Sequence, residues 1–218
     1  MKIFKKIFVT VLALVLIISN TNITTYAASI NDSSIDYYMK NTTETVNING
    51  VNYTYKYFYD ANKNKTISVT NNSTNSIDTV KYNESTSTIY LNNNVISTGT
   101  ADKSILNPLS ASASALTASA SSSWTLVGTY KNKITWAQGT TAAVVAAAVA
   151  IPLSSIGVSG IIAAIGVAAL GTIAAASTGG TVYQTIYQRT IGSTLQVKDL
   201  WYFTASTGDE YGPYTNIY

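Results

Sequence analysis

The sequence predicts an α+β fold, in which an N-terminal antiparallel β-meander is followed by an Ala/Gly-rich helical hairpin flanked by a small antiparallel sheet. Two observations support this prediction. Apolar and polar residues alternate between Glu44 and Ile96, which is the period of half-buried strands. Residues 142–176 instead contain thirteen Ala, thirteen large aliphatic residues and four Gly, and no charge interrupts residues 134–188. A segment of this kind favours helices that are buried or surrounded by lipid.

The composition excludes most catalytic chemistry. The 218-residue chain has no Cys and no His, so it lacks thiol nucleophiles, cysteine-built metal sites and the commonest general base near neutral pH. The segment Gly157–Gly160 lacks the final glycine of a nucleophile elbow, because position 161 is Ile. We therefore expect no enzyme activity, no catalytic residues, no cofactor and no metal site. A formal charge of +3 is too small to predict a nucleic-acid partner.

Residues 1–27 have the pattern of a secretory signal peptide. Three lysines precede the apolar residues 7–18, and a polar stretch follows up to Ala27. This order predicts cleavage by signal peptidase between Ala27 and Ala28 and a secreted, extracellular product. The alternative is an uncleaved anchor, but the apolar run is shorter than the ~20 residues that a spanning helix needs. Ten basic residues (thirteen minus three) and ten acidic residues remain after the cut.

Residues 28–100 form the predicted β-rich pro-region. The dipeptide Asn49-Gly50 is its strongest hairpin signal, because both central positions of a type I′ turn need a positive φ. The side-chain period of two then places the flanking apolar residues on one face. The expected facing pairs are Ile48 with Val51 and Val46 with Tyr53.

Short strands and Asn-rich turns are expected to continue this meander. The segment Asp60–Lys65 begins like a calcium loop, but its sixth position is Lys65 and its twelfth is Asn71, where such a loop needs Gly and Glu. A hairpin turn is therefore the better prediction. Further strands are expected at Thr66–Thr70, Ile77–Tyr82, Ser87–Leu91 and Val95–Ser97.

Residues 101–123 are predicted to be a linker. From residue 111 onwards all but two of its residues are Ala or Ser, so the segment has little apolar surface to offset the entropy of ordering it. Small residues in an exposed linker are preferred sites of proteolysis, and we expect a processing protease to cut between Ala120 and Ser121. The alternative is a flexible spacer that is never cut.

The helical hairpin is expected to contain one helix at Ile134–Ile151 and a second at Ser155–Ser177, because Pro152 cannot continue a helix. Ser155 or Ser159 is expected to cap the second helix. The two helices would measure about 27 and 34 Å, close to the ~30 Å thickness of the bilayer hydrocarbon. Small residues at four-residue spacing would let the helices pack closely: Ala142, Ala146 and Ala150, and Gly160, Ala164 and Ala168.

Strands and aromatic residues flank the hairpin within residues 124–218, the predicted C-terminal part. Alternation indicates strands at 124–126, 182–186 and 195–203. The flanking aromatic and basic side chains suit the boundary of a bilayer, and they equally suit strands packed over a buried hairpin. The candidate interfacial residues are Trp124, Lys131, Lys133, Trp136, Tyr183, Tyr187, Arg189 and Trp201.

Three interpretations of the hairpin remain open, because composition does not separate buried helices from lipid-facing ones. The hairpin leaves a soluble fold and inserts into a membrane, it is a permanent soluble core, or it is a permanent two-span anchor. Four basic and three acidic residues follow Ala120, so electrostatic attraction to a membrane is expected to be minor. The candidate membrane-inserting residues are Val144, Val145, Val149, Ile151, Leu153, Ile156, Ile161, Ile162, Ile165, Val167, Leu170 and Ile173.

The layout resembles large secreted bacteriocin precursors of Gram-positive bacteria, of the closticin type. The resemblance rests on the signal peptide, on the strand-rich segment with Ile48–Tyr53, on the Ala/Gly hairpin after Trp124, and on the tail from Thr181 to Tyr218. It implies that processing releases roughly the C-terminal half as an antimicrobial toxin. That half would permeabilise the membranes of competitor cells.

The expected partners are accordingly the target-cell membrane, signal peptidase, a processing protease and further copies of the released segment, which would associate through the small-residue faces of their helices. No nucleic acid is expected. Two other functions remain open. The chain is an exported surface protein with binding or structural duties, whose hairpin is a buried core, or it is a membrane partner that neutralises a toxin and has two spans.

Overall fold

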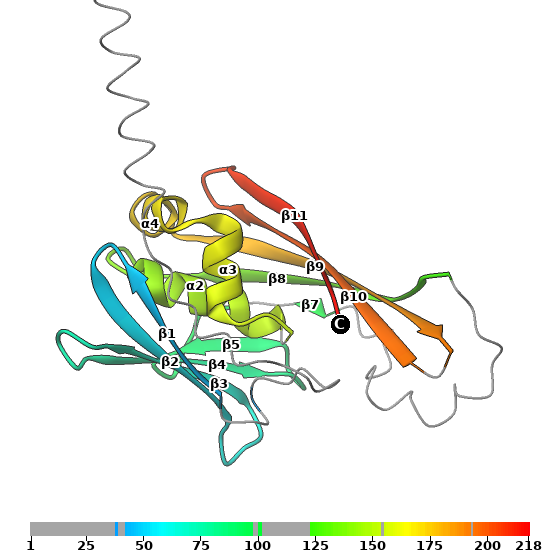
Figure 1. The fold of residues 1–218 in the computed structure, drawn as a ribbon. Coiled ribbons are helices and arrows are strands. Elements are labelled where there is room, and N and C mark those ends of the chain that lie inside the picture. Colours follow the sequence, from blue (N-terminus) through cyan, green and yellow to red (C-terminus); the bar gives the residue numbers. More distant parts are fainter. Residues whose placement is uncertain (1–37, 39–41, 98–99, 102–122, 154, 193) are drawn as a thin grey trace, which may run out of the picture.

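The computed structural model describes residues 38, 42–97, 100–101, 123–153, 155–192 and 194–218. The predicted signal peptide with its cut between Ala27 and Ala28, and the predicted cut between Ala120 and Ser121, lie outside these residues. The fold is α+β, as expected, with two antiparallel sheets and a group of short helices between them (Figure 1).

The first sheet is a meander whose six strands lie side by side in chain order. Its Asn49-Gly50 turn has φ values of 52° and 84°, the positive values of a type I′ hairpin. The predicted pairs Ile48 with Val51 and Val46 with Tyr53 are confirmed. The strands are β1 (Thr43–Ile48), β2 (Val51–Tyr59), β3 (Lys65–Asn71), β4 (Ile77–Asn83), β5 (Thr88–Leu91) and β6 (Asn94–Val95).

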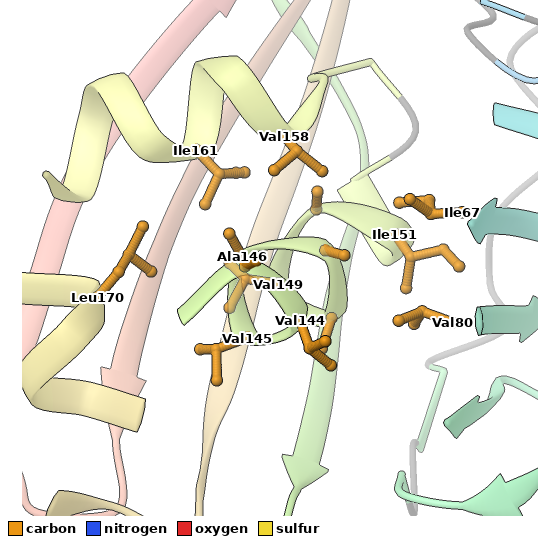
Figure 2. Close-up of a cluster of buried hydrophobic side chains, with 14 of the residues drawn as sticks. Ile67, Val80, Val144, Val145, Ala146, Val149, Ile151, Val158, Ile161 and Leu170 are labelled. Atoms are coloured by element: carbon orange, nitrogen blue, oxygen red, sulfur yellow. The ribbon is translucent and has the colours of Figure 1, made fainter. Parts of the chain in front are cut away.

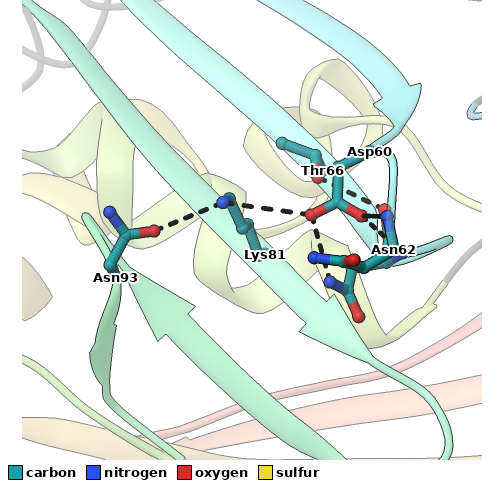
Figure 3. A network of polar contacts seen from close by, with 6 residues as sticks. Asp60, Asn62, Thr66, Lys81 and Asn93 are labelled. Carbon is teal, nitrogen blue, oxygen red and sulfur yellow. Dashed lines mark hydrogen bonds and ion pairs between the residues drawn. The ribbon is translucent and has the colours of Figure 1, made fainter.

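The hairpin turn predicted between β2 and β3 is confirmed, and Asp60 organises it (Figure 3). One carboxylate oxygen of Asp60 accepts hydrogen bonds from the backbone amides of Asn62 and Asn64, both at 2.9 Å. The other accepts from the Asn64 side chain at 3.0 Å and lies 3.9 Å from the Lys81 ammonium. Burial alone would raise the pKa of this carboxyl group, but these hydrogen bonds and Lys81 hold it below its ordinary value.

The second sheet has the strand order β11-β10-β9-β8-β7. It is joined to the first sheet at Ile96, whose carbonyl accepts a hydrogen bond from the Thr135 amide at 2.6 Å and whose own amide donates to Ile89. The two halves of the chain therefore meet directly. The strands are β7 (Thr100–Ala101), β8 (Thr125–Thr135), β9 (Gly179–Ile191), β10 (Thr194–Ala205) and β11 (Glu210–Ile217).

The helices are shorter than predicted. The prediction of a helix at Ile134–Ile151 is wrong at its start, because Ile134 belongs to the alternating strand β8 and pairs with Gly180. The first helix begins only after Thr141, whose hydroxyl caps it by accepting from the Val144 amide. The helices are α2 (Ala142–Ala150), the 3-10 turn η3 (Ile151–Leu153), α3 (Val158–Ile165) and α4 (Val167–Ala176).

The prediction of one second helix at Ser155–Ser177 is also wrong, because Gly166 divides it into α3 and α4. Gly166 has a φ of 91° and a ψ of 142°, which a residue with a side chain rarely adopts. Neither Ser155 nor Ser159 caps α3 with its side chain. The N-cap residue is Gly157, and it makes no side-chain hydrogen bond.

One hydrophobic core joins all three layers (Figure 2). Ile67 and Val80 project from β3 and β4 towards Ile151, and on the far side of α2 the side chains of Ile161 and Leu170 close over the helix. Helix α2 contacts both remaining helices as well as β3 and β4. The first sheet therefore covers one side of the helical layer, and β11 of the second sheet contacts α3.

Candidate membrane-active helices and their enclosure

The aliphatic residues predicted to enter a membrane lie in the core. Among the twelve candidates only Val167 is not fully buried, and it packs against the same core. Helices α2 to α4 carry no charged side chain. Buried uncharged helices of this kind have the same composition whether their surroundings are protein or lipid.

Of the two predicted sets of small residues at four-residue spacing, the first lies on one helix and the second does not. In α2, Ala146 and Ala150 are buried and Ala142 is half-buried. Helix α2 contacts α3 and α4 closely along its length. The second ridge is divided by the bend at Gly166, so that Gly160 and Ala164 belong to α3 while Ala168 is an exposed residue of α4. A methyl group on Gly160 would lie 2.7 Å from Ile156 Cγ2, so this position needs glycine for packing.

Within the part of the chain that the structure describes, no helix on its own has the length and apolarity of a membrane span. Ala142–Leu153 and Val158–Ile165 satisfy both conditions only when they are taken together. In the folded protein the two pieces meet at a bend of 111°.

The first sheet holds α3 by its N-terminus. The hydroxyl of Tyr57 accepts a hydrogen bond from the Val158 amide at 2.6 Å and donates to the carboxylate of Glu44. The same oxygen of Glu44 accepts from the Ser159 amide at 3.1 Å. Two of the amides that a helix N-terminus leaves without a partner are thus satisfied by side chains more than a hundred residues away. We call Glu44 and Tyr57 the β1–β2 cap.

The electrostatics of this cap are favourable. The positive end of the α3 dipole faces the carboxylate of Glu44. Burial raises the pKa of the Tyr57 phenol well above its usual value, and the neighbouring charge and hydrogen bond of Glu44 raise it further. Tyr57 therefore stays protonated and keeps its donor. Beside the cap, the Tyr55 hydroxyl lies 3.4 Å from the carbonyl oxygen of Ala143 in α2.

The second sheet holds the segment between η3 and α3 through Asp199, which is 2% exposed. One oxygen of its carboxyl group lies 2.6 Å from the Ser155 hydroxyl and accepts from the Gln184 side chain at 2.8 Å. The Ser155 hydroxyl also lies 2.8 Å from the carbonyl oxygen of Leu153. The Ser155 hydroxyl has a single hydrogen and two acceptors within reach, the carboxyl oxygen of Asp199 and the carbonyl oxygen of Leu153.

Burial is the main cause that raises the pKa of Asp199 to about 6, and the hydrogen bonds from Ser155 and Gln184 oppose the shift. Its second oxygen has no hydrogen-bond partner. The carboxylate form is therefore poorly solvated in this fold. Asp199 becomes charged near neutral pH at a cost in stability.

Two more contacts tie the second sheet to the helices. The Tyr214 hydroxyl donates to the Ala164 carbonyl at 2.8 Å, and the Trp136 indole donates to the Ser177 carbonyl at 3.0 Å. Trp136 and Trp201, two of the predicted interfacial residues, are core residues in this fold. The helical layer is consequently held by polar contacts from both sides.

The other predicted interfacial residues lie on the outer face of the second sheet. Register and alternation place Lys131, Lys133, Tyr183, Tyr187 and Arg189 on the side opposite the helices, with Trp124 next to them. Lys131 lies 5.3 Å from the Tyr183 ring, and Arg189 lies 4.2 Å from the Trp124 ring. The structure thus separates the predicted set into two buried tryptophans and a cationic and aromatic group on the outer face, whose members are exposed or half-buried.

The β1–β2 cap and Asp199 were not among the predicted site residues, although the sequence contains a signal for both. Glu44 shares the inward side of β1 with Val46 and Ile48. Asp199 shares the inward side of β10 with Trp201 and Phe203. A carboxylate in the apolar register of a strand is costly unless it has a specific partner. Such a position therefore indicates a buried contact.

No group of three or more acidic, His or Cys residues that could hold a metal occurs among the described residues. Comparison of the chain with protein-family models, with curated protein sequences and with solved structures found no match.

Proposed function

We propose that the chain is a secreted, bacteriocin-like precursor whose C-terminal part inserts its hydrophobic helices into the membranes of competitor cells and permeabilises them. The observation that carries the proposal is the enclosure of an uncharged helical layer by a separate N-terminal sheet, which holds it through the β1–β2 cap. In this role residues 28–100 mask the helices until the chain reaches a bilayer.

Insertion requires a change in the helices. Helix α2 has nine residues, which is about 14 Å, less than half of the ~30 Å hydrocarbon layer. The segment Ala142–Ile165 has 24 residues and would measure about 36 Å as one helix with a kink at Pro152. Such a kink is tolerated in membrane helices where neighbouring side chains bond the freed carbonyl groups. Straightening of the 111° bend between α2 and α3 is thus the central conformational step of the proposal.

Straightening must break the β1–β2 cap. In a continuous helix the amides of Val158 and Ser159 bond to carbonyl groups one turn earlier, so they no longer need Tyr57 and Glu44. Because the bilayer offers no water to unpaired amides, the helical partners are then required. Each amide exchanges a side-chain acceptor for a carbonyl group of the helix, so the number of hydrogen bonds changes little. The exchange lets α3 leave the first sheet.

A cut between Ala120 and Ser121 does not by itself unmask the helices, since the first sheet contacts α2 and α3 through the core and not only through the linker. Before cleavage the first sheet and the helices belong to one chain. After cleavage the first sheet is a separate fragment that is bound only by non-covalent contacts, so it can dissociate. The cut lowers the effective concentration of the mask near the helices. Contact with lipid then completes the release.

Release of dye from sealed vesicles tests this function. A recognition site for a sequence-specific protease is inserted between Ala120 and Ser121 of the full chain, and the folded protein is added to vesicles before and after the cut. We expect leakage after the cut and little before it. Intact vesicles in the presence of cut protein, with both fragments verified by mass spectrometry, would contradict the proposal.

A second candidate function is an exported surface protein with a binding or structural role, in which the helices are a permanent core. The contacts that hold the helical layer from both sheets, at Glu44, Asp199 and Tyr214, favour this candidate. Tryptophan fluorescence separates the two functions. In a Trp124→Phe variant, which leaves only the two core tryptophans, quenchers attached to lipid acyl chains reduce the fluorescence of Trp136 and Trp201 if the core opens into the bilayer. They leave it unchanged if the core persists.

A further inference from the structure

We propose that the outer face of the second sheet docks the protein on anionic phospholipid bilayers before any helix inserts. The inference deepens the proposed function by naming its first step. Positive charges and aromatic rings gather on this one sheet face, an arrangement that the sequence order alone does not reveal.

All four basic residues of the C-terminal part lie on this face. Lys131 and Lys133 are two positions apart in β8 and therefore lie on the same side of the sheet. Arg189 lies in β9, and Lys198 of β10 pairs directly with Tyr187 of β9. Lys131, Lys133 and Lys198 face away from the helices, because their strand neighbours Asn132 and Asp199 are buried, and the pairing register places Arg189 on the same face. The net charge of +1 for this part of the chain therefore hides a local concentration of positive charge.

The acidic residues do not cancel it. Asp199 is buried on the inner face, and Asp209 lies in the turn between β10 and β11. Glu210 pairs with Thr204 at the end of the sheet and is the acidic residue on the outer face within the described strands. Four cations against one carboxylate give the face an excess positive charge, which suits an anionic surface.

The rings between these cations favour a lipid surface as the partner. Lys198 lies 4.3 Å from the Tyr187 ring and 4.8 Å from the Trp124 ring, and Tyr183 stacks on Tyr202 at 4.4 Å. Lysine stems and amphipathic rings are the groups that settle among phospholipid headgroups. Since these ring faces are already covered by cations or by each other, they are not available to stack nucleic-acid bases.

Exposed aliphatic side chains on the same face supply an apolar contribution. Leu126, 57% exposed, pairs with Tyr187, and Ile217, 55% exposed, pairs with Lys198. A soluble polyanion offers no apolar surface against which these side chains could be buried. The boundary of an acyl layer does, and it removes them from water. Charge complementarity and apolar contact therefore agree on a bilayer.

Docking through this face is separate from insertion, because the sheet then lies between the bilayer and the helices. Binding can therefore be measured without leakage. The experiment uses the full chain and sedimentation with vesicles of phosphatidylcholine alone or mixed with phosphatidylglycerol. We expect binding to the anionic vesicles, weaker binding to neutral ones, and a loss of affinity as salt is raised.

Charge variants locate the contact. Each of Lys131→Gln and Lys198→Gln should lower the partition constant about fivefold, which corresponds to about 1 kcal/mol for one basic residue near an anionic surface. Lys63→Gln, in the exposed turn between β2 and β3, removes the same charge elsewhere and should change little. Lys131→Arg keeps the charge and should keep the binding.

Three results would overturn the docking proposal: equal loss of binding in Lys63→Gln, unchanged binding in the double variant of Lys131 and Lys198, or equally tight binding of inorganic polyphosphate at the same phosphate concentration. Leakage from the cut protein is scored in parallel. Anionic binding without leakage contradicts the proposed function and supports docking, whereas leakage that persists after binding is lost contradicts docking alone.

Discussion

The carboxylate of Glu44 in β1 accepts a hydrogen bond from the backbone amide of Ser159 in α3, 115 residues further along the chain, at 3.1 Å. The donor is one of the amides that a helix N-terminus leaves unpaired, and the acceptor is the charge that the helix dipole favours there. An N-terminal sheet strand therefore completes a helix of the C-terminal part. This contact links the stability of the helical layer to the presence of the first sheet.

Tyr57→Phe should destabilise the fold by about 1–3 kcal/mol, because it leaves the Val158 amide buried without a partner and removes a donor from Glu44. Urea unfolding measures the change. Amide exchange should accelerate first at the start of α3. As a control, Tyr90→Phe removes a hydroxyl from the strand position next to the buried Ile89, which faces the other way. Equal effects of the two variants would show that the cap contributes nothing specific.

Asp199 should make the folded state less stable as pH rises from about 4 to 6. Its folded pKa of about 6 is higher than the ordinary 3.8, so the folded state binds more protons in this range, and the free energy of unfolding falls with increasing pH. Two pKa units correspond to about 3 kcal/mol. Asp199→Asn should lack this component and be more stable than the parent at pH 7.

The pH dependence of Asp199 is isolated by subtraction. Unfolding free energies of the parent and of Asp199→Asn are measured between pH 4 and 8, and their difference contains the contribution of this group. Asp209→Asn, in the exposed turn, serves as the control. A constant difference across the range would mean that Asp199 is charged throughout and that burial does not raise its pKa.

Gly166→Ala should lower stability and accelerate leakage by the cut protein. A side chain is strained at a φ of 91°, at a cost of about 1–3 kcal/mol, and the strain is relieved if α3 and α4 become one continuous helix. Gly171→Ala is the matched control, because its added methyl group meets only Asn49 at 3.8 Å. That variant should stabilise α4 by about 0.5–1 kcal/mol and slow leakage. The same rate in both variants would argue against the joining of α3 and α4 during insertion.

Cleavage between Ala120 and Ser121 should leave the two fragments bound to each other in water. The first sheet shares one core with the helices, and its contacts at Tyr55 and Tyr57 do not depend on the linker. Size-exclusion chromatography of the cut protein should give one peak containing both fragments, and added anionic vesicles should separate them. Two peaks in the absence of lipid would show that the linker, not the interface, holds the mask in place.

Local sequence determined the first sheet almost completely. The turn at Asn49-Gly50 and the alternation around it predicted the register of β1 and β2, because turn geometry and a side-chain period of two act between near neighbours. The same alternation identified Ile186 and Trp201 as strand residues. Glu44 and Asp199 stand in the apolar register of their strands, but neither residue was predicted to make a buried contact.

Only the tertiary structure decided where the helices begin and end. Residues 134–188 contain no charge, so the sequence lacks the charged residues that mark helix boundaries. An isolated glycine such as Gly166 does not by itself predict a helix break. The bend there, the capping of α3 by Glu44 and the burial of Asp199 depend on contacts between residues that are far apart in the chain. Local periodicity carries no information about such contacts, because they form only when the two sheets close over the helices.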